Sequence, residues 1–198
     1  MPVRQAIHFL GQAATNFRQT GAIAPSSRRL ARELAQAIGS VRPGGVVIEL
    51  GPGTGSVTDA LRTWHPTASV IAVENNPTFA RRLSDRLPSV RVVQGCASAL
   101  PEHLRRFGHG REDVVAVVSG LPLLSLPPEL VSRIFDSVRD VLLPGRRFVQ
   151  FTYSARAFSR LAPEGFTPEP RRRVWFNVPP AMVLPFTRTG VVACSTAS

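Results

Sequence analysis

The stretch Val46–Gly55 constrains the fold more than any other part of this chain. Its first five residues are apolar except for Glu49, as expected of a strand that is buried on both faces. Three glycines follow in alternation with a proline and a threonine: Gly51, Gly53 and Gly55. Glycine tolerates positive φ and leaves no side chain between the backbone and a ligand. Since ligands of open α/β sheets bind beyond the carboxyl ends of the strands, this turn predicts a ligand site.

The spacing of this turn indicates which kind of ligand to expect. The dinucleotide fingerprint G-x-G-x-x-G holds a pyrophosphate, whereas the pattern here is E-x-G-x-G-x-G. That pattern resembles motif I of the class I S-adenosylmethionine-dependent methyltransferases. S-adenosylmethionine carries a sulfonium and an ammonium instead of phosphates, so a carboxylate beside the loop suits it. The resemblance implies S-adenosylmethionine as methyl donor, held by Glu49 and the three glycines, and no metal ion.

Strand and helix patterns alternate along the rest of the chain. Strands are predicted over residues 69–73, 90–94, 113–118 and 147–153, with helices over 77–87, 101–107 and 128–142. This alternation predicts an α/β fold with a doubly wound, mostly parallel sheet. Two further strands at 173–178 and 182–186, joined by two prolines, predict an antiparallel edge. With the resemblance above, we expect a Rossmann-like class I methyltransferase with a seven-stranded sheet.

The chain of 198 residues predicts one domain, preceded by an amphipathic helical segment at about residues 1–24. Apolar residues recur at helical spacing over residues 3–18, which fits either a membrane-surface helix or a helix packed across the domain. Ser26 or Ser27 is expected to cap the next helix, whose apolar face includes Leu30 and Leu34.

The formal net charge of +11 rests on arginine alone, because the chain contains no lysine. Such an excess favours an anionic partner, either nucleic acid or an anionic membrane, although it can also reflect the codon habit of the source genome. Cys96 and Cys194 lack the spacing of a zinc site or a disulfide framework. No apolar run reaches the length of a membrane span, and the first residues lack the apolar core of a signal peptide. We therefore expect a soluble or peripheral protein in the cytoplasm.

Polar residues that follow the predicted strands are the candidate site residues. Glu74 ends the second strand and can bind both ribose hydroxyls of the methyl donor, or else cap the next helix; Asn75 follows it. Cys96 and Ala97 follow the third strand. Class I methyltransferases usually have an acidic residue at the position of Cys96, beside the adenine. Backbone groups of Cys96 and Ala97 can still serve the ring edge.

The fourth strand delivers Ser119 and a leucine-rich loop, residues 120–127, to the same edge. Enzymes that methylate the ring-attached amines of bases often present Asn or Asp, Pro and a stacking aromatic ring here. The leucine-rich loop lacks that set and suits a flexible amine on an apolar molecule, or else is a purely structural loop. Ser119 is therefore a candidate for contact with both methyl donor and acceptor.

Five segments in order carry a more specific resemblance: residues 20–27, 49–55, 119–123, 150–153 and 174–181. Together they resemble the short bacterial phospholipid N-methyltransferases. The resemblance implies stepwise methylation of phosphatidylethanolamine, through its mono- and dimethylated forms, to phosphatidylcholine. It also implies a peripheral enzyme on the inner face of the cytoplasmic membrane. The N-terminal helix and arginines would contact anionic lipid, and no nucleic acid would be bound.

On this reading, one or more of three consecutive arginines would bind the lipid phosphate: Arg171, Arg172 and Arg173. Tyr153 would orient the acceptor amine as a catalytic residue, with Ser119. The ring of Tyr153 or of Trp175 could stabilise a methylated ammonium. No His or carboxylate stands out as a base, so desolvation of the amine and proton loss to water are expected.

Two rival functions stay open at the level of the sequence. One is an adenine N6-dimethyltransferase of ribosomal RNA, which has a very similar glycine loop and would suit the basic charge. The other is a non-catalytic basic module that binds membranes or nucleic acid. The missing Asn-Leu-Pro-aromatic motif argues against the first, and the intact glycine loop with Glu49 and Glu74 argues against the second.

Overall fold

The computed structural model describes residues 27–154, 158, 163–175 and 180–190. The predicted helix at residues 3–18, the segment at about 1–24, residues 176–179 and Cys194 lie outside these ranges. Within the described residues, no helix is long and apolar enough to cross a membrane.

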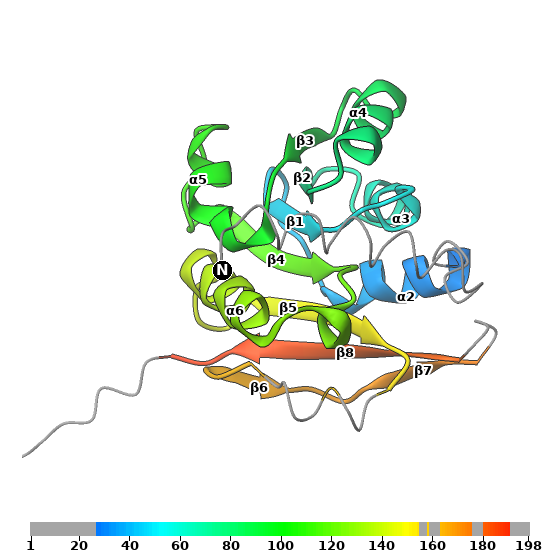
Figure 1. Cartoon of the computed structure of the whole chain (residues 1–198), viewed down its shortest axis with the longest axis vertical. Coiled ribbons are helices and arrows are strands. Elements are labelled where there is room, and N and C mark those ends of the chain that lie inside the picture. The colour runs from blue at the N-terminus through cyan, green and yellow to red at the C-terminus, as the bar shows by residue number, and fades with distance from the viewer. Residues whose placement is uncertain (1–26, 155–157, 159–162, 176–179, 191–198) are drawn as a thin grey trace, which may run out of the picture.

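A mixed sheet forms the centre of the molecule, in the strand order β3-β2-β1-β4-β5-β8-β6 (Figure 1). Five strands run parallel: β1 (Val46–Leu50), β2 (Ser69–Glu74), β3 (Arg91–Gln94), β4 (Val114–Ser119) and β5 (Arg147–Thr152). The long strand β8 (Ala181–Arg188) runs antiparallel to β5. The carboxyl ends of the five parallel strands therefore meet at one edge, where the predicted site residues lie.

The outer edge of the sheet is a broken strand. Both β6 (Phe166–Pro168) and β7 (Arg172–Val174) pair with β8, β6 at its end and β7 at its start. This arrangement confirms the predicted antiparallel edge. Among the described residues, the sheet has eight strands where seven were predicted, because two short strands share its outer position. The sequence patterns did not predict β6, because three residues are too few to show alternation.

Pro185 explains how β8 tolerates a proline in mid-strand. Its carbonyl accepts the N–H of Glu169, in the break between β6 and β7. In a β-strand the N–H and C=O of one residue point to the same side, so the N–H that Pro185 lacks would also face that break. The proline thus removes no hydrogen bond from the ladder with β5.

Helices cover both faces of the sheet (Figure 1). One face carries α2 (Arg28–Ala37), α3 (Ser56–Trp64) and α4 (Pro77–Arg86), and the other carries η1 (Ala97–Ala99), α5 (Leu100–Arg105), η2 (Leu123–Ser125) and α6 (Pro128–Val141). We call these the α2 face and the α6 face. Ser27 caps α2 by accepting the N–H of Leu30, which confirms one of the two predicted caps.

A charged network ties the broken edge to the α2 face. Arg147 at the start of β5 donates to both carboxylate oxygens of Glu169 at 2.8 Å, and its Nη1 donates to the carbonyl of Ala37 at 3.3 Å. Thr187 on β8 also donates to Glu169. Burial acts to raise the pKa of Glu169, but the bond from Thr187 and the charge of Arg147 prevail and lower it.

Glu169→Gln is expected to lower the free energy of unfolding by about 1 kcal/mol at neutral pH, because it weakens a partly exposed bidentate pair. Since the folded-state pKa of Glu169 lies below its usual 4.5, this contribution is present above that pH and is lost as the pH falls through the folded pKa. Urea unfolding of both proteins at several pH values would measure it. Glu129→Gln, at an exposed position of α6, is the control. If the difference in free energy of unfolding between wild type and Glu169→Gln stayed constant from pH 7 to pH 3, the lowered pKa of Glu169 would be contradicted.

Candidate functional site

The glycine loop and the loop after β4 meet backbone to backbone. Gly51 has φ of 67° and donates its N–H to Val73 on β2 at 2.9 Å, while Gly120 donates to Leu50 at 2.8 Å. A Cβ placed on Gly120 would lie 2.8 Å from the carbonyl oxygen of Gly51. Only a residue without a side chain therefore allows the two loops to approach this closely.

Glu74 at the end of β2 holds the glycine loop in place. Its Oε2 accepts the N–H of Gly53 at 3.0 Å, and its Oε1 accepts the N–H of Asn76 at 2.8 Å. The cap of α4 is Asn76, whose Oδ1 accepts from Thr78 and Phe79. The alternative that Glu74 merely caps the next helix is therefore wrong. A carboxylate has about four acceptor positions, so the two bonds leave room for ligand hydroxyls.

Glu49 is a buried carboxylate at the end of β1, with 1% of its surface exposed. Its Oε2 has no hydrogen-bond partner within the described part of the chain. Burial raises the pKa of Glu49 to about 8, with polar groups of Thr58 on α3 acting in the opposite direction. Nearby Asp59 and Glu74 add to the rise through their charges. A buried carboxyl without a partner destabilises the folded protein. A cationic ligand bound beside Glu49 would supply the missing partner.

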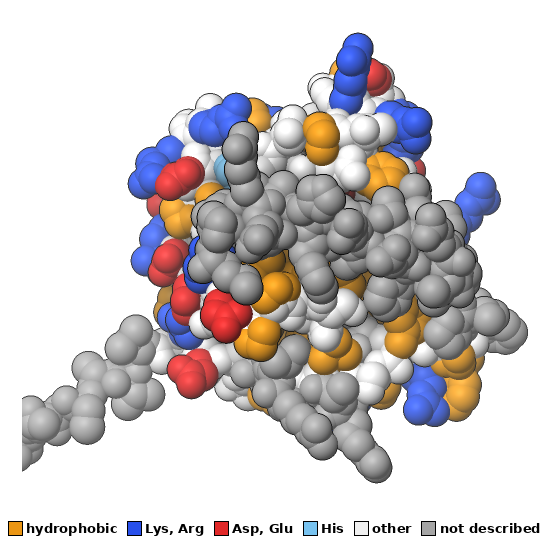
Figure 2. Space-filling view, in the orientation of Figure 1, with side chains coloured by type: hydrophobic (Ala, Val, Ile, Leu, Met, Phe, Trp, Pro, Cys, Tyr) orange, Lys and Arg blue, Asp and Glu red, His pale blue; other side chains and the backbone are white. Residues whose placement is uncertain are grey.

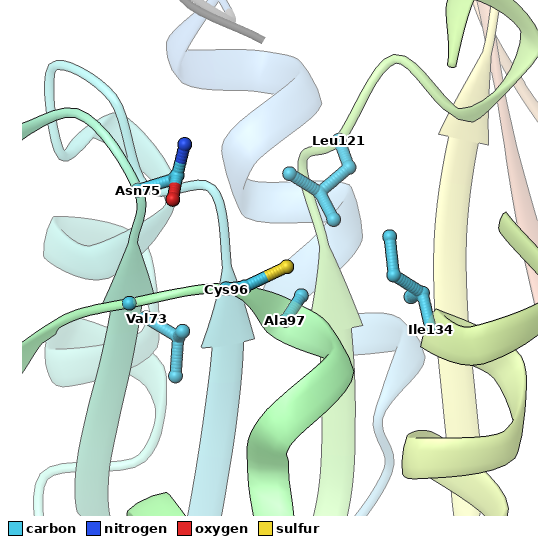
Figure 3. Close-up of a pocket in the computed structure, with 7 residues that line it drawn as sticks. Val73, Asn75, Cys96, Ala97, Leu121 and Ile134 are labelled. Carbon is cyan, nitrogen blue, oxygen red and sulfur yellow. The ribbon is translucent and has the colours of Figure 1, made fainter. Parts of the chain in front are cut away.

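A small pocket of about 20 Å³ opens at the carboxyl ends of β2, β3 and β4 on the α6 face. Its lining residues are Val73, Asn75, Gly95, Cys96, Ala97, Leu121 and Ile134. Figure 3 shows the thiol of Cys96 pointing into the space between Asn75 on one side and Leu121 and Ile134 on the other. Three predicted cofactor residues, Asn75, Cys96 and Ala97, thus line one small pocket, which is mostly apolar.

The backbone carbonyl of Cys96 is already engaged. It accepts a hydrogen bond from Nε2 of His103 at 3.0 Å and another from the N–H of Ala99 at 3.2 Å. The thiol accepts from the hydroxyl of Ser98 at 3.1 Å. Both lone pairs of the carbonyl are therefore used within the protein, which leaves the Asn75 side chain and other backbone groups of this segment for a bound ring edge.

Ser119 is fully buried at the end of β4, and its Oγ accepts the N–H of Leu121 at 3.3 Å. Gln150, its neighbour in register on β5, donates its Nε2 to the carbonyl of Leu121 at 3.0 Å. The two side chains hold the backbone of Leu121 from both sides. Contact of Ser119 with methyl donor or acceptor stays a prediction, whereas its observed contact supports the leucine-rich loop.

Tyr153 lies on the opposite face from the pocket. It packs against the core of the α2 face and makes an edge-to-face contact with Phe151, with ring centroids 5.7 Å apart. The structure therefore does not bring Tyr153 together with Cys96 and Leu121 on one face. Its predicted role at the acceptor amine requires an acceptor that reaches the edge of the sheet from the α2 side.

The three consecutive arginines, Arg171 just before β7 and Arg172 and Arg173 within it, differ in their contacts. Arg172 faces Glu33 on α2, with 3.8 Å between the charged atoms, and the guanidinium of Arg173 lies 4.5 Å from the ring centre of Trp175. Arg171 is exposed at the surface. Trp175 is 64% exposed, so its ring is a surface group with one face covered by Arg173. Of the three, Arg172 is therefore the least available to an anionic ligand.

Arg86 is a loop-positioning residue that the sequence patterns did not single out. Its Nη1 donates to both oxygens of Asp59 on α3 at 2.9 and 2.8 Å, and its Nη2 donates to the carbonyl of Thr54 in the glycine loop. It thus joins α4, α3 and the loop from outside. Only the fold reveals this role, because Arg86 and Thr54 are far apart in the chain.

Arg86→Met is expected to raise the dissociation constant of the methyl donor about threefold, because an exposed ion pair contributes up to about 1 kcal/mol. Isothermal titration with S-adenosylhomocysteine would measure it. Arg82→Met, at an exposed position one turn earlier on α4, is the matched control. Equal dissociation constants for the two variants would show that Arg86 does not support the loop.

No group of three or more His, Cys, Asp or Glu side chains is arranged to hold a metal ion in the ranges that the structure describes.

Fold and site together define a Rossmann-like class I methyltransferase: a parallel sheet with one antiparallel strand, a glycine loop after β1 and an acidic residue at the end of β2. Residues 47–145 match the family described as "Methyltransferase domain". The chain belongs to this family of S-adenosylmethionine-dependent enzymes. It is 35% identical over 182 residues to an ornithine lipid N-methyltransferase from Singulisphaera acidiphila, covering 87% of this chain and 91% of that protein.

Solved methyltransferases share the fold. A 1,6-didemethyltoxoflavin-N1-methyltransferase from Burkholderia thailandensis, with S-adenosylhomocysteine bound, aligns with a TM-score of 0.67 at 17% identity, covering 96% of this chain and 92% of that chain. NodS, an N-methyltransferase from Bradyrhizobium japonicum, gives 0.65 at 14% identity, covering 84% and 98%. TrmN from Thermus thermophilus gives 0.62 at 24% identity over 80% of this chain, which spans only 48% of TrmN. At these identities the likeness establishes the fold.

Proposed function

We propose that this protein transfers methyl groups from S-adenosylmethionine to the amine of a membrane lipid headgroup. The observation that carries the proposal is the similarity to a lipid N-methyltransferase along 87% of the chain. Phosphatidylethanolamine and its mono- and dimethylated forms are the proposed acceptors. Phosphatidylcholine is the final product, made at the inner face of the cytoplasmic membrane.

The residues around the glycine loop fit the methyl donor. S-adenosylmethionine supplies an electrophilic methyl group on a sulfonium. Glu49 has an orphaned oxygen for a cationic group, and Gly53 leaves the backbone of the loop open, because an added Cβ there would meet no atom within 4 Å. The small pocket at Cys96 offers an apolar lining. Glu74 keeps acceptor capacity for hydroxyls. This set suits the charged groups and hydroxyls of the methyl donor.

The surface near the site supports a lipid acceptor. Leu124 in the leucine-rich loop is 42% exposed, and Trp175 at the end of β7 is also exposed. Trp rings with an adjoining Arg suit the water–lipid boundary, where one part is apolar and the other wet. On the face seen in Figure 2, hydrophobic side chains lie nearer the centre and arginines lie mainly around the rim.

In this proposal, Arg171 and Arg173 bind the lipid phosphate, while Arg172 is held by Glu33. Tyr153 contacts the lipid headgroup from the α2 side, and Ser119 acts mainly through the leucine-rich loop. The amine loses its proton to water once it enters the apolar site, since desolvation lowers its pKa. Positioning two reactants in this way can supply roughly 7–11 kcal/mol of the rate acceleration.

An ornithine lipid is a second candidate acceptor, because it is named for the relative with 35% identity. Its headgroup is an amino acid instead of phosphoethanolamine.

A single assay separates the candidates. The full-length protein is incubated with methyl-labelled S-adenosylmethionine and, separately, with vesicles that contain phosphatidylethanolamine, vesicles that contain ornithine lipid, and ribosomal RNA. Label in phosphatidylethanolamine supports the proposal, and label only in ornithine lipid replaces the acceptor but keeps the reaction. Label in RNA alone, or in none of the three, would overturn the proposal. Flotation of the protein with anionic vesicles, with and without residues 1–18, tests the membrane role of the N-terminal segment.

A further inference from the structure

Gln150 has a side-chain oxygen that the fold leaves without a partner. Its Nε2 donates to two backbone carbonyls, those of Leu121 at 3.0 Å and Phe151 at 2.7 Å. Carbonyls only accept, so these two contacts fix the orientation of the amide. Its Oε1 is then left buried and without a hydrogen-bond partner among the described residues, on a side chain that is 1% exposed.

Gln150 lies on the α6 face of the sheet, behind Leu121, which lines the pocket. Side chains alternate along a strand, so Gln150 shares its face with Phe148, which belongs to the core of the α6 face. Leu121, whose carbonyl Gln150 binds, lines the pocket and lies against Gly51, where an added Cβ would meet its side chain at 2.7 Å. Gln150 therefore stands directly behind the junction of the glycine loop and the leucine-rich loop.

We propose that Oε1 of Gln150 accepts a hydrogen bond from the neutral amine of the acceptor lipid and turns its lone pair toward the methyl donor. This inference rests on the proposed function. The amine nitrogen forms a bond to the methyl carbon while the bond from that carbon to the sulfonium sulfur breaks. The new ammonium later loses one proton to water. The amide oxygen orients the nitrogen and takes no proton, because a primary amide is not a base in this pH range.

This assignment makes the three methylation steps unequal. A primary amine has two N–H groups and a secondary amine has one, so each can bond to Gln150 while its lone pair attacks. A neutral dimethylated amine has no N–H and leaves the oxygen unpaired. A buried acceptor that a ligand leaves unsatisfied disfavours that ligand. Gln150 thus favours the first two methylations over the third.

The contacts of Nε2 alone predict a different result. If Gln150 only clamps Leu121, its loss loosens the loop for every acceptor alike, and the ratio of rates among acceptors stays fixed. Damage to the loop therefore cancels when the kcat/KM values of two acceptors are divided within one variant. The remaining change in that ratio measures the contribution of the Gln150 oxygen.

The test uses Gln150→Met, which keeps the length of the side chain without amide groups. The control is Thr152→Val, two residues further on the same face of β5, which removes a buried hydroxyl that accepts from Ser154. For each protein, kcat/KM is measured with unmethylated, monomethylated and dimethylated phosphatidylethanolamine in mixed vesicles. Binding of a short-chain phosphatidylethanolamine in the presence of S-adenosylhomocysteine is measured by calorimetry.

Gln150→Met is expected to lower kcat/KM for the unmethylated lipid about tenfold more than for the dimethylated lipid, and to weaken binding of the unmethylated lipid by a similar factor. Thr152→Val should leave the ratios as in the wild type. A common factor for all three acceptors in Gln150→Met would overturn the inference. If this variant does not fold, the wild-type protein still tests the inference. Its kcat/KM should be about tenfold lower for the dimethylated than for the monomethylated lipid. An equal or higher kcat/KM for the dimethylated lipid would contradict the role of Gln150. A wild type that methylates none of the three lipids refutes phosphatidylethanolamine as the acceptor, and with it the proposal on which this inference rests.

Discussion

Gly120→Ala is expected to lower both affinity for the methyl donor and turnover by about 100-fold, because a displacement of roughly 1 Å at the reacting groups has an effect of that size. The new Cβ would lie 2.8 Å from the carbonyl oxygen of Gly51 and 3.4 Å from that of Leu50. Neither backbone atom can rotate away as a side-chain end could. The loop after β4 must therefore move off the glycine loop, and both halves of the site shift relative to each other.

Titration with S-adenosylhomocysteine and steady-state methylation would measure the effect, and circular dichroism would show that the variant is folded. The control is Gly190→Ala, where an added Cβ meets no atom within 4 Å. It should bind and turn over as the wild type does. A folded Gly120→Ala protein with unchanged affinity would show that the close contact of the two loops is not needed for the site.

Glu49→Gln is expected to have opposite effects on stability and on binding. The pKa of Glu49 is raised to about 8 by burial, so the folded state holds a proton between the ordinary value of 4.5 and about 8. In the wild type without ligand, the free energy of unfolding therefore falls as the pH rises through this window, by about 1.4 kcal/mol per pH unit at most. The glutamine variant lacks that slope and should be the more stable protein at pH 8.

Binding of the methyl donor should weaken in the same variant, by roughly 10- to 100-fold at pH 8, because a hydrogen bond to a charged group contributes roughly 1.5–3 kcal/mol. In the wild type the affinity should rise with pH up to about 8, since a cationic ligand binds the ionised carboxylate. Thermal melts and titrations from pH 5 to pH 9 would check both effects. Glu102→Gln, at an exposed position of α5, is the control. A Glu49→Gln protein that keeps the pH dependence of the wild type would contradict this account.

Most of the α/β order was predictable, because each strand and helix carries its own period of apolar residues. Five parallel strands and the helices between them fall within a few residues of the predicted ranges. The part of the fold that was not predicted in full is the antiparallel edge of the sheet. Strand β6 is too short to show a pattern, and the break beside Pro185 depends on pairing with residues far away in the chain.

Some residues of the candidate site were likewise predictable from the sequence, and others were not. Glu49, the glycines and Glu74 were predicted because one polar residue in an apolar strand, or a run of glycines, stands out locally. Gln150 carries the same signal, a polar residue inside a buried strand, and could have been singled out. Arg86 could not, since its role depends on contacts with Thr54 and Asp59 across three elements.

The sequence by itself determined the class of fold, the edge of the sheet at which the candidate site lies and the candidate residues for the methyl donor, because these follow from local periodicity and from the order of strands. Only the tertiary structure decided which side chains share a face and a partner. It placed Tyr153 and Gln150 on opposite faces of one strand, buried Ser119 under Leu121 and joined Arg172 to Glu33. Such pairings depend on packing between segments distant in the chain, which no local pattern encodes.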